Sequence, residues 1–213
     1  MLAFIDCYIN EPVNHSINEY LLNNPIPYTY HCPAKFGLKS LLSLPSNPSK
    51  IILLGSASNV TANERWHLEL LEYLIPILES GTPLLGICFG HQLLASHYGS
   101  RINYISQDQI NLKELRKVKI IRSFFNYSRS ETLNLAYAHQ QVICELGPEL
   151  EVLGASKISP YEIIKHKKYP FWGTQSHPEA SVQFLAEDAN IKGDLRLIQT
   201  TGHRFISEFL NHC

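Results

Sequence analysis

The sequence of this 213-residue chain lacks the marks of a membrane, secreted or nucleic-acid-binding protein. No apolar run approaches the ~20 residues that cross a bilayer, because the longest candidate, Leu70–Leu78, contains Glu72. The first residues, Met1–Asp6, have no basic group of the kind that begins a secretion signal. With 18 Lys and Arg against 19 Asp and Glu, the net charge of −1 provides no general attraction to nucleic acid. These absences predict a cytoplasmic protein that binds neither membranes nor nucleic acid.

Disulfide and metal frameworks are also missing from the sequence. The five cysteines cannot all pair, and their positions match no zinc-binding spacing: Cys7, Cys32, Cys88, Cys144 and Cys213. We therefore expect free thiols in a reducing compartment, and neither a metal nor an organic cofactor. There is no G-x-x-x-x-G-K-[ST] loop to hold a nucleotide phosphate. A hydrophobic content of 45% with 17% charged residues excludes a disordered chain.

Short apolar runs alternate with helical periodicity, the pattern of a parallel sheet covered by helices. Because no repeat, low-complexity tract or linker interrupts it, residues 1–213 are predicted to form a single α/β domain. The first half is predicted to contain strands at Leu2–Ile5, Tyr28–His31, Lys50–Leu54 and Pro83–Ile87, and helices at Val13–Asn23 and His91–Tyr98. From Leu115 the β-like runs are Lys117–Ile121, Asn134–Ala138, Glu151–Ala155, Tyr161–Ile164 and Phe171–Gln175. We expect a mainly parallel central sheet flanked by helices, with a smaller β elaboration.

Two further helices have recognisable limits. Thr61 and Glu64 have the spacing of a capping box, before an amphipathic stretch that is followed by Gly81, a residue suited to a left-handed cap. Pro76 lies within this stretch and is expected to kink the helix or end it early. A C-terminal helix is predicted from the helical spacing of Leu195, Ile198, Phe205, Phe209 and Leu210. Gly202 interrupts that pattern and argues against one unbroken helix.

A basic segment lies in the β-rich half, where residues 113–122 contain five of the 18 Lys and Arg. Alternation with Val118 and Ile120 favours a solvated strand face. The functional alternative is a docking surface for a partner or for an anionic acceptor.

A nucleophile candidate stands where a predicted strand meets a predicted helix. Cys88 lies between Gly86 and Gly90, the layout of a nucleophile elbow with sulfur in place of the serine oxygen. A β-carbon at either glycine would clash in so tight a turn. The following helix directs its free N–H groups and positive dipole end at the sulfur, which favours the reactive thiolate. The alternative is a structural cysteine in a glycine-rich turn.

A base for this nucleophile is indicated by Gln175-Ser-His177-Pro-Glu179, which follows a strand pattern. Residues two apart in extended backbone project to the same side, and Pro178 keeps His177 extended. Glu179 is therefore expected to accept one ring N–H of His177 and leave the other side of the ring for Cys88. The alternative is an ordinary surface turn.

Taken together, Gly-Ile-Cys88-Phe-Gly-His-Gln92 and Gln-Ser-His177-Pro-Glu179 resemble the class I (triad) glutamine amidotransferase family, from the Lys50–Val60 strand and loop through Glu179. The resemblance implies a flavodoxin-like α/β fold, with Cys88 as nucleophile, His177 as base and Glu179 as the orienting carboxylate. It also implies that Gln92 helps to hold the α-amino and carboxylate end of glutamine. His139, Gln140 and Gln141 are similar to the family's other substrate-binding segment, although His139 is equally explained as a structural residue.

The sequence departs from the family at the loop that supplies an oxyanion hole. The family usually has a Gly-Gly-Pro sequence there, whereas this chain has Gly55-Ser56-Ala57-Ser58. Backbone N–H groups do the oxyanion work, so the side-chain change need not abolish it. We expect these amides to come from Phe89 and from either Gly55 or Ser56.

The implied reaction is hydrolysis of the glutamine side-chain amide through a γ-glutamyl thioester, with ammonia passed to an acceptor on a synthetase partner. Because the triad alone does not separate them, a γ-glutamyl peptidase that acts on a peptide or conjugate is the alternative. A non-catalytic or metal-binding module is a third reading, based on His91, His97, His139 and His177. Against a metal, His91 and His97 are six residues apart, not the four of a helical ligand pair.

Overall fold

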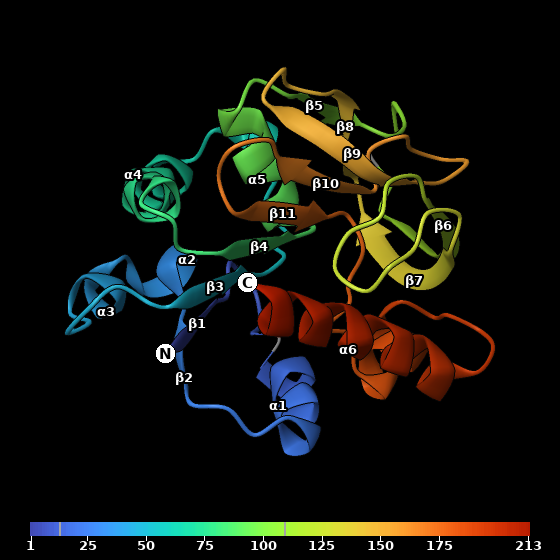
Figure 1. The fold of residues 1–213 in the computed structure, drawn as a ribbon, viewed down its shortest axis with the longest axis horizontal. Helices are drawn as coiled ribbons and strands as arrows, with labels where there is room; N and C mark the ends of the chain where they lie inside the picture. Colours follow the sequence, from blue (N-terminus) through green and yellow to red (C-terminus); the bar gives the residue numbers. More distant parts are fainter. Residues whose placement is uncertain (13, 109) are drawn as a thin grey trace.

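A large twisted sheet forms the centre of the computed structural model, which describes residues 1–12, 14–108 and 110–213 (Figure 1). In the described part it has nine strands in the order β2-β1-β3-β4-β11-β10-β9-β6-β7. The strands, in that order, are Tyr28–His31, Leu2–Ile5, Lys50–Leu53, Leu84–Ile87, Phe171–Thr174, Ile163–His166, Leu150–Ala155, Leu112–Ile120 and Thr132–His139. Neighbours are parallel from β2 to β11 and antiparallel from β11 to β7. The predicted α/β class is confirmed, and the β elaboration continues the main sheet.

Two strands escaped prediction. β5 (Arg101–Tyr104) and β8 (Gln141–Glu145) form a separate antiparallel pair beside the main sheet. Neither strand has an uninterrupted apolar run, since β5 contains Arg101 and Asn103, and β8 begins with Gln141 and ends with Glu145. β8 follows β7 after a single residue, Gln140, so the chain turns sharply next to the predicted substrate-binding segment.

Helices cover both faces of the parallel half (Figure 1). α4 (Arg65–Glu79) and α5 (Phe89–His97) lie on one face, and α1 (Asn14–Asn23) and α6 (Leu195–His212) on the other. The helix predicted at Val13–Asn23 is confirmed from Asn14, and Val13 lies outside the described residues. Short helical segments complete the chain: α2 (Pro33–Phe36), α3 (Lys39–Leu42), η1 (Val60–Ala62) and η2 (Phe184–Asp188).

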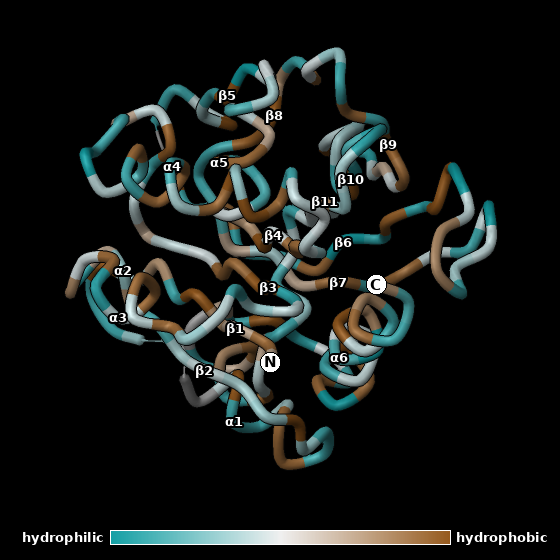
Figure 2. The backbone as a smooth tube through the Cα atoms, turned by 60° about the vertical axis from the view of Figure 1, so that its left-hand side comes forward, coloured by the Kyte–Doolittle hydropathy of each residue, from teal (hydrophilic) through white to brown (hydrophobic). Residues whose placement is uncertain are grey.

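The parallel strands β1 and β4 are apolar throughout because both of their faces are buried. Alternate residues of β1 enter different cores: Ile5 packs in the cluster that contains the apolar residues of α4 and α5, and Phe4 in the cluster with α1 and α6. Figure 2 shows these strands as hydrophobic segments in the interior. No helix in the described part of the chain is long and apolar enough to cross a membrane.

Helix α4 begins and ends differently from its predicted course. It starts at Arg65 after the extended residue Glu64, and Thr61 belongs to η1, so the capping box is wrong. Both side chains have other partners: Thr61 Oγ1 accepts a hydrogen bond from Gln141 Nε2, and Glu64 accepts one from Ser58. The helix passes through Pro76 and ends at Glu79, although the proline has no N–H to donate to the carbonyl four residues before it. Gly81 has the predicted positive φ, 106°.

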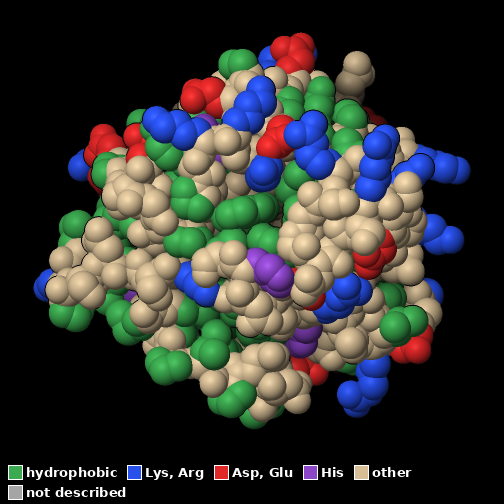
Figure 3. All heavy atoms as spheres, in the orientation of Figure 1, with side chains coloured by type: hydrophobic (Ala, Val, Ile, Leu, Met, Phe, Trp, Pro, Cys, Tyr) green, Lys and Arg blue, Asp and Glu red, His purple; other side chains and the backbone are tan. Residues whose placement is uncertain are grey.

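The basic segment is not simply a solvated face. Along β6, Lys113, Lys117 and Lys119 are exposed, but Arg116 is buried and pairs with Glu162, also buried, at 3.1 Å. Its guanidinium lies over the ring of Tyr137, 4.2 Å from the ring centre. On the side of the molecule drawn in Figure 3, Lys and Arg side chains are spread over the region of the antiparallel strands, with Asp and Glu between them.

α6 is one unbroken helix, contrary to the expectation based on Gly202. Its N-terminus is capped by Asp194, which accepts a hydrogen bond from the Leu197 amide at 3.1 Å. Gly202 is buried, and a β-carbon there would lie 2.5 Å from the carbonyl oxygen of Pro178. The glycine therefore allows α6 to press directly on the backbone between His177 and Glu179.

Replacing Gly202 with alanine tests this contact. Alanine normally stabilises a helix interior by roughly 0.5–1 kcal/mol relative to glycine. Here we expect Gly202→Ala to lower the free energy of unfolding by about 1–3 kcal/mol, because the added methyl group meets backbone. Chemical denaturation should show this loss, while Asn211→Ala at an exposed position of the same helix should change stability little. A Gly202→Ala variant as stable as the parent protein would contradict the inferred contact.

Candidate active site

Cys88 occupies a strained turn between β4 and α5. Its φ of 50° and ψ of −100° lie in a region that non-glycine residues rarely adopt. A β-carbon on Gly86 would lie 2.7 Å from the Gly90 carbonyl, and one on Gly90 would lie 2.5 Å from the Leu53 carbonyl. The predicted need for glycine on both sides is therefore explained by close backbone packing. The turn leaves the cysteine side chain at the carboxyl end of the sheet.

The other two triad candidates come from the neighbouring strand. β11 pairs in parallel with β4, and the Cys88 amide donates to the Thr174 carbonyl at 2.8 Å, so the chain after β11 passes beside the cysteine. His177 Nδ1 lies 2.8 Å from Glu179 Oε1, as the spacing predicted. The Ala138 carbonyl lies 3.3 Å from His177 Nε2 and 3.9 Å from Cys88 Sγ. The structure thus gathers Cys88 and His177 around one carbonyl of β7, with Glu179 bonded to the other ring nitrogen of His177.

The electrostatics of this cluster favour a protonated imidazole. Burial lowers the pKa of His177, but the Glu179 carboxylate and the Cys88 sulfur outweigh burial, so its pKa lies well above the usual range. His177 therefore holds a proton at neutral pH and is suited to donate it. The His177 main chain is also fixed, because its amide donates to the Ala136 carbonyl at 2.8 Å.

The three predicted oxyanion residues lie next to Cys88. Phe89 is the first residue of α5, where an amide finds no carbonyl partner within the helix. A β-carbon on Gly55 would lie 3.6 Å from Cβ of Cys88 and 3.1 Å from Cε1 of His177, so this loop covers both residues. Ser56 borders the recess that contains Cys88.

The loop that lacks Gly-Gly-Pro is held instead by the side chain of Ser58. The Ser58 hydroxyl donates to Glu64 Oε1 at 2.6 Å and lies 3.0 Å from His67 Nε2. Its amide donates to Ser56 Oγ at 3.0 Å. These bonds anchor the loop to the start of α4, which explains the use of Glu64 at a place where a helix cap was expected.

The predicted substrate-binding residues all border the recess beside Cys88, but most are engaged within the protein. Gln92 Nε2 donates to the Gln141 carbonyl at 2.7 Å and to Gln175 Oε1 at 2.8 Å. His139 Nδ1 bonds to the Gln141 carbonyl at 2.7 Å, and burial lowers its pKa to about 3, so the ring is neutral. The Gln141 side chain bonds to Thr61. Among these four, only Gln140 has a side chain without a hydrogen bond to the described residues.

Two hollows flank the Cys88–His177 pair. The smaller, about 80 Å³, contains Cys88 and the residues just described. The larger, about 390 Å³, lies on the His177–Glu179 side and is bordered by Tyr8, Ile9 and Phe184 among others. Ser56, Ala57, Asn111 and Ala138 border both hollows. The triad candidates therefore stand between a small recess and a larger cavity.

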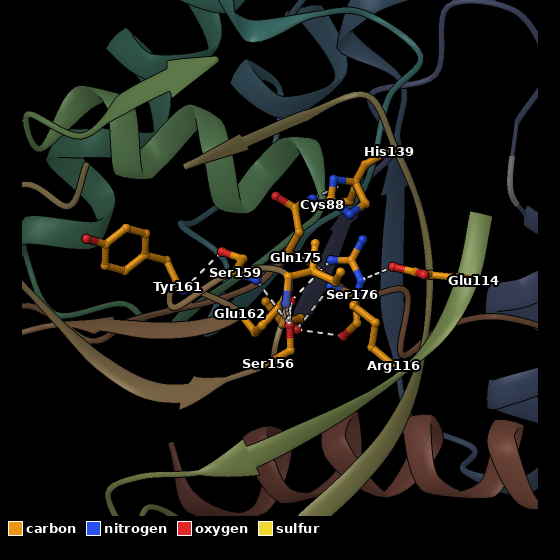
Figure 4. A network of polar contacts seen from close by, with 12 residues as sticks. Cys88, Glu114, Arg116, His139, Ser156, Ser159, Tyr161, Glu162, Gln175 and Ser176 are labelled. Carbon is orange, nitrogen blue, oxygen red and sulfur yellow. Dashed lines mark hydrogen bonds and ion pairs between the residues drawn. The ribbon is translucent and has the colours of Figure 1, made fainter. Parts of the chain in front are cut away.

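Gln175 was not among the predicted site residues, although it contacts the nucleophile. It is fully buried, and its Nε2 donates to Cys88 Sγ at 3.6 Å. Figure 4 shows Gln175 next to Cys88, with Arg116 and Glu162 on its other side. Gln175 directly follows the strand pattern of β11, and this position could have identified it. Residues that follow parallel strands lie at the same edge of the sheet, where the nucleophile also lies.

The four histidines considered as metal ligands, His91, His97, His139 and His177, have different surroundings in the structure. His91 is fully buried against Gly173, and burial lowers its pKa to about 3. His97 ends α5, and its ring packs against that of Tyr98. Within the described ranges there is no group of three or more His, Cys, Asp and Glu side chains placed to hold a metal ion.

Comparison with known proteins agrees with this geometry. The family model for "Glutamine amidotransferase class-I" matches residues 3–187. The chain therefore belongs to the class-I glutamine amidotransferase family and is an enzyme of that class.

Curated relatives carry the names of glutamine-hydrolysing GMP synthases or of their subunits. The chain is 33% identical over 143 residues to a glutamine-hydrolysing GMP synthase subunit of Pyrococcus abyssi, which covers 67% of this chain and 72% of that protein. It is 33% identical over 103 residues to the subunit of the same name in Thermococcus kodakarensis, or 48% of this chain and 54% of that protein. A GMP synthase of Francisella philomiragia matches at 28% over 105 residues, which span 49% of this chain and only 20% of the longer protein.

Solved structures share the fold. A glutamine amidotransferase from Thermotoga maritima superposes with a TM-score of 0.74 at 17% identity, covering 99% of this chain and 96% of that one. A putative GMP synthase subunit from Thermoplasma acidophilum gives 0.68 at 18% identity, with the same coverage of 99% and 96%.

The Glu179–His177 bond leads to a prediction about pH. Glu179→Gln removes the charge that keeps the His177 pKa high, so the fall in activity at alkaline pH should begin at lower pH. The glutaminase kcat should also drop by roughly 10²–10⁴-fold, the usual contribution of general acid–base catalysis. A pH series of kcat would measure both effects, with the exposed Glu72→Gln as matched control. An unchanged alkaline limb in Glu179→Gln would show that this carboxylate does not govern His177.

Proposed function

We propose that this chain, acting as a single domain, hydrolyses the side-chain amide of glutamine, with Cys88 as nucleophile, His177 as acid and base, and Glu179 as orienting carboxylate. The observation that carries the proposal is the convergence of the strained Cys88 turn with the His177–Glu179 pair at 2.8 Å. Membership of the class-I family supports it, because the matched region contains all three residues.

The chemistry follows from the positions of these groups. The Cys88 thiolate attacks the amide carbon, and backbone amides of Phe89 and of Gly55 or Ser56 hold the oxyanion. The C–N bond breaks as His177 donates its proton to the leaving nitrogen, which gives ammonia and a γ-glutamyl thioester. Water then attacks the thioester carbon while His177 takes its proton, and the C–S electron pair returns to sulfur. The products are glutamate, ammonia and the regenerated cysteine.

The small recess is proposed to hold glutamine, with Gln140 directed to the substrate and His139, Gln141 and Gln92 shaping the wall. We further propose that ammonia passes to an acceptor on a synthetase partner. The names of the Pyrococcus and Thermococcus proteins support this idea, since each is named as one subunit of a synthase, which implies another. The sequence itself contains no phosphate-binding loop that would activate an acceptor.

A glutamine-like diazoketone tests the proposed function directly. Intact-mass analysis should show a single adduct on Cys88, and an ammonia assay with L-glutamine should show release that Cys88→Ala abolishes. The reason is that an activated thiolate beside a recess that binds the glutamine part of the reagent reacts faster than the other cysteines. Cys144→Ala, which removes a half-buried cysteine outside the site, is the matched control. An adduct that spreads over several cysteines, or none at Cys88, would refute the assignment.

A second candidate is hydrolysis of γ-glutamyl amides that carry an organic group on nitrogen. The relatives' names give it no support, and the feature that favours it is the cavity of about 390 Å³ beside His177, far larger than ammonia needs. If it holds, γ-glutamyl anilide is cleaved at least as efficiently as glutamine, and Ile9→Trp, which narrows the cavity, lowers the anilide rate more than the glutamine rate. Steady-state kinetics with both substrates decides the matter: glutamine turnover without anilide cleavage eliminates this candidate.

A further inference from the structure

Gln175 is placed where its amide faces the reactive sulfur. Its Nε2 lies 3.6 Å from Cys88 Sγ, a normal length for a hydrogen bond to sulfur, and the side chain is fully buried. The Gln175 main chain is also held, because its amide donates to the Glu162 carbonyl at 2.9 Å. Glu162 is in turn anchored by the buried Arg116 (Figure 4).

The orientation of the Gln175 amide is determined by its neighbour Gln92. An amide side chain has one acceptor oxygen and one NH₂ donor. Gln92 uses its NH₂ for the Gln141 carbonyl at 2.7 Å and for Gln175 Oε1 at 2.8 Å. Because Oε1 of Gln175 accepts from Gln92, the NH₂ of Gln175 must point toward Cys88. The two glutamines thus form a chain of amides that begins at a main-chain carbonyl and ends at the sulfur.

The surroundings of the sulfur show why such a donor matters. The Ala138 carbonyl, 3.9 Å from Sγ, presents an oxygen, and an oxygen does not stabilise an anion. His177 is cationic at the start of the reaction but gives its proton away when the amide nitrogen leaves. Gln175 does not titrate and keeps its N–H at every stage. Hydrogen bonds to charged groups are also stronger than those between neutral groups.

We propose that Gln175 is a further catalytic residue, which donates a hydrogen bond to the Cys88 thiolate before attack and again when the thioester C–S bond breaks. Gln92 is a positioning residue that orients Gln175 through its NH₂ group. The inference rests on the proposed function, since it concerns the same nucleophile. It assigns a role in the chemistry to the residue two positions before His177.

The test measures thiolate reactivity without any substrate. Iodoacetamide alkylation of Cys88 is followed across pH 5–10 by peptide mass spectrometry in the parent protein, Gln175→Met and Gln175→Glu. Methionine has the same length but no N–H, and glutamate replaces the donor with oxygen. Near neutral pH, Cys88 in both variants should be alkylated at least roughly tenfold more slowly than in the parent protein. The rates should approach the parent rate only at higher pH, because the lost hydrogen bond stabilised the thiolate. Gln107→Met, at an exposed position, is the matched control and should follow the parent profile.

The outcome is decided for each variant that keeps a cooperative thermal transition. Profiles that coincide with the parent, or move to lower pH, overturn the proposal for Gln175. If neither Gln175 variant folds, the same profile in Gln92→Met decides, because loss of the orienting donor should shift it in the same direction by a smaller amount, and an unshifted profile overturns the proposal.

Glutaminase kinetics separate the two roles of Gln92. A positioning role predicts that Gln92→Met lowers kcat with little change in KM, whereas a substrate ligand would raise KM and leave kcat largely intact. The second result overturns the part assigned to Gln92. If the parent protein has no glutamine turnover, the proposed function fails, yet the alkylation profiles still show whether Gln175 stabilises the thiolate.

Discussion

The parallel pairing of β4 with β11 is the contact on which the site depends. It places the ends of two strands that are more than eighty residues apart in the sequence next to each other, joined by the bond from the Cys88 amide to the Thr174 carbonyl. The cysteine turn and the His-Pro-Glu segment each occupy the first residues after a strand, so their positions follow from that pairing. The antiparallel strands beyond β11 then bring β7 next to this segment. The Ala136 carbonyl of β7 accepts a hydrogen bond from the His177 amide, and the Ala138 carbonyl lies near both the His177 ring and the sulfur.

The buried charged side chains next to Gln175 belong to one ion pair, Arg116 with Glu162. Arg116 and Glu162 are both buried, and burial of such a pair costs desolvation that its attraction only partly returns. Its value lies in geometry: the pair connects β6, which carries Arg116, to the residue whose carbonyl receives the Gln175 amide. The position of β7 is supported in the same way, because the Arg116 guanidinium lies over Tyr137, between the two alanines that contact the triad candidates.

Much of the fold and the three central residues could be predicted from the sequence, because their signals are local. Apolar runs mark the parallel strands, and the glycines beside Cys88 mark a turn that only they permit. Thr61, Glu64 and Arg116 were misjudged because their partners, Gln141, Ser58 and Glu162, belong to other elements. β5 and β8 were missed because polar residues interrupt their short apolar content and no local apolar run marks them. The engagement of Gln92 and Gln175 with each other depends on the packed structure, which no spacing in the sequence reveals.

The close approach of α6 to Pro178 has a consequence for how the family region is delimited. The family model ends at residue 187, whereas α6 begins at Leu195, so the helix that supports the His-Pro-Glu turn lies outside the recognised segment. A chain cut at that limit would keep every motif residue and lose the surface against which the turn is pressed. The segment that contains the motif residues therefore ends before the helix that supports them. The contact between Gly202 and the Pro178 backbone makes the C-terminal helix part of the packing that holds the His177–Glu179 turn in place.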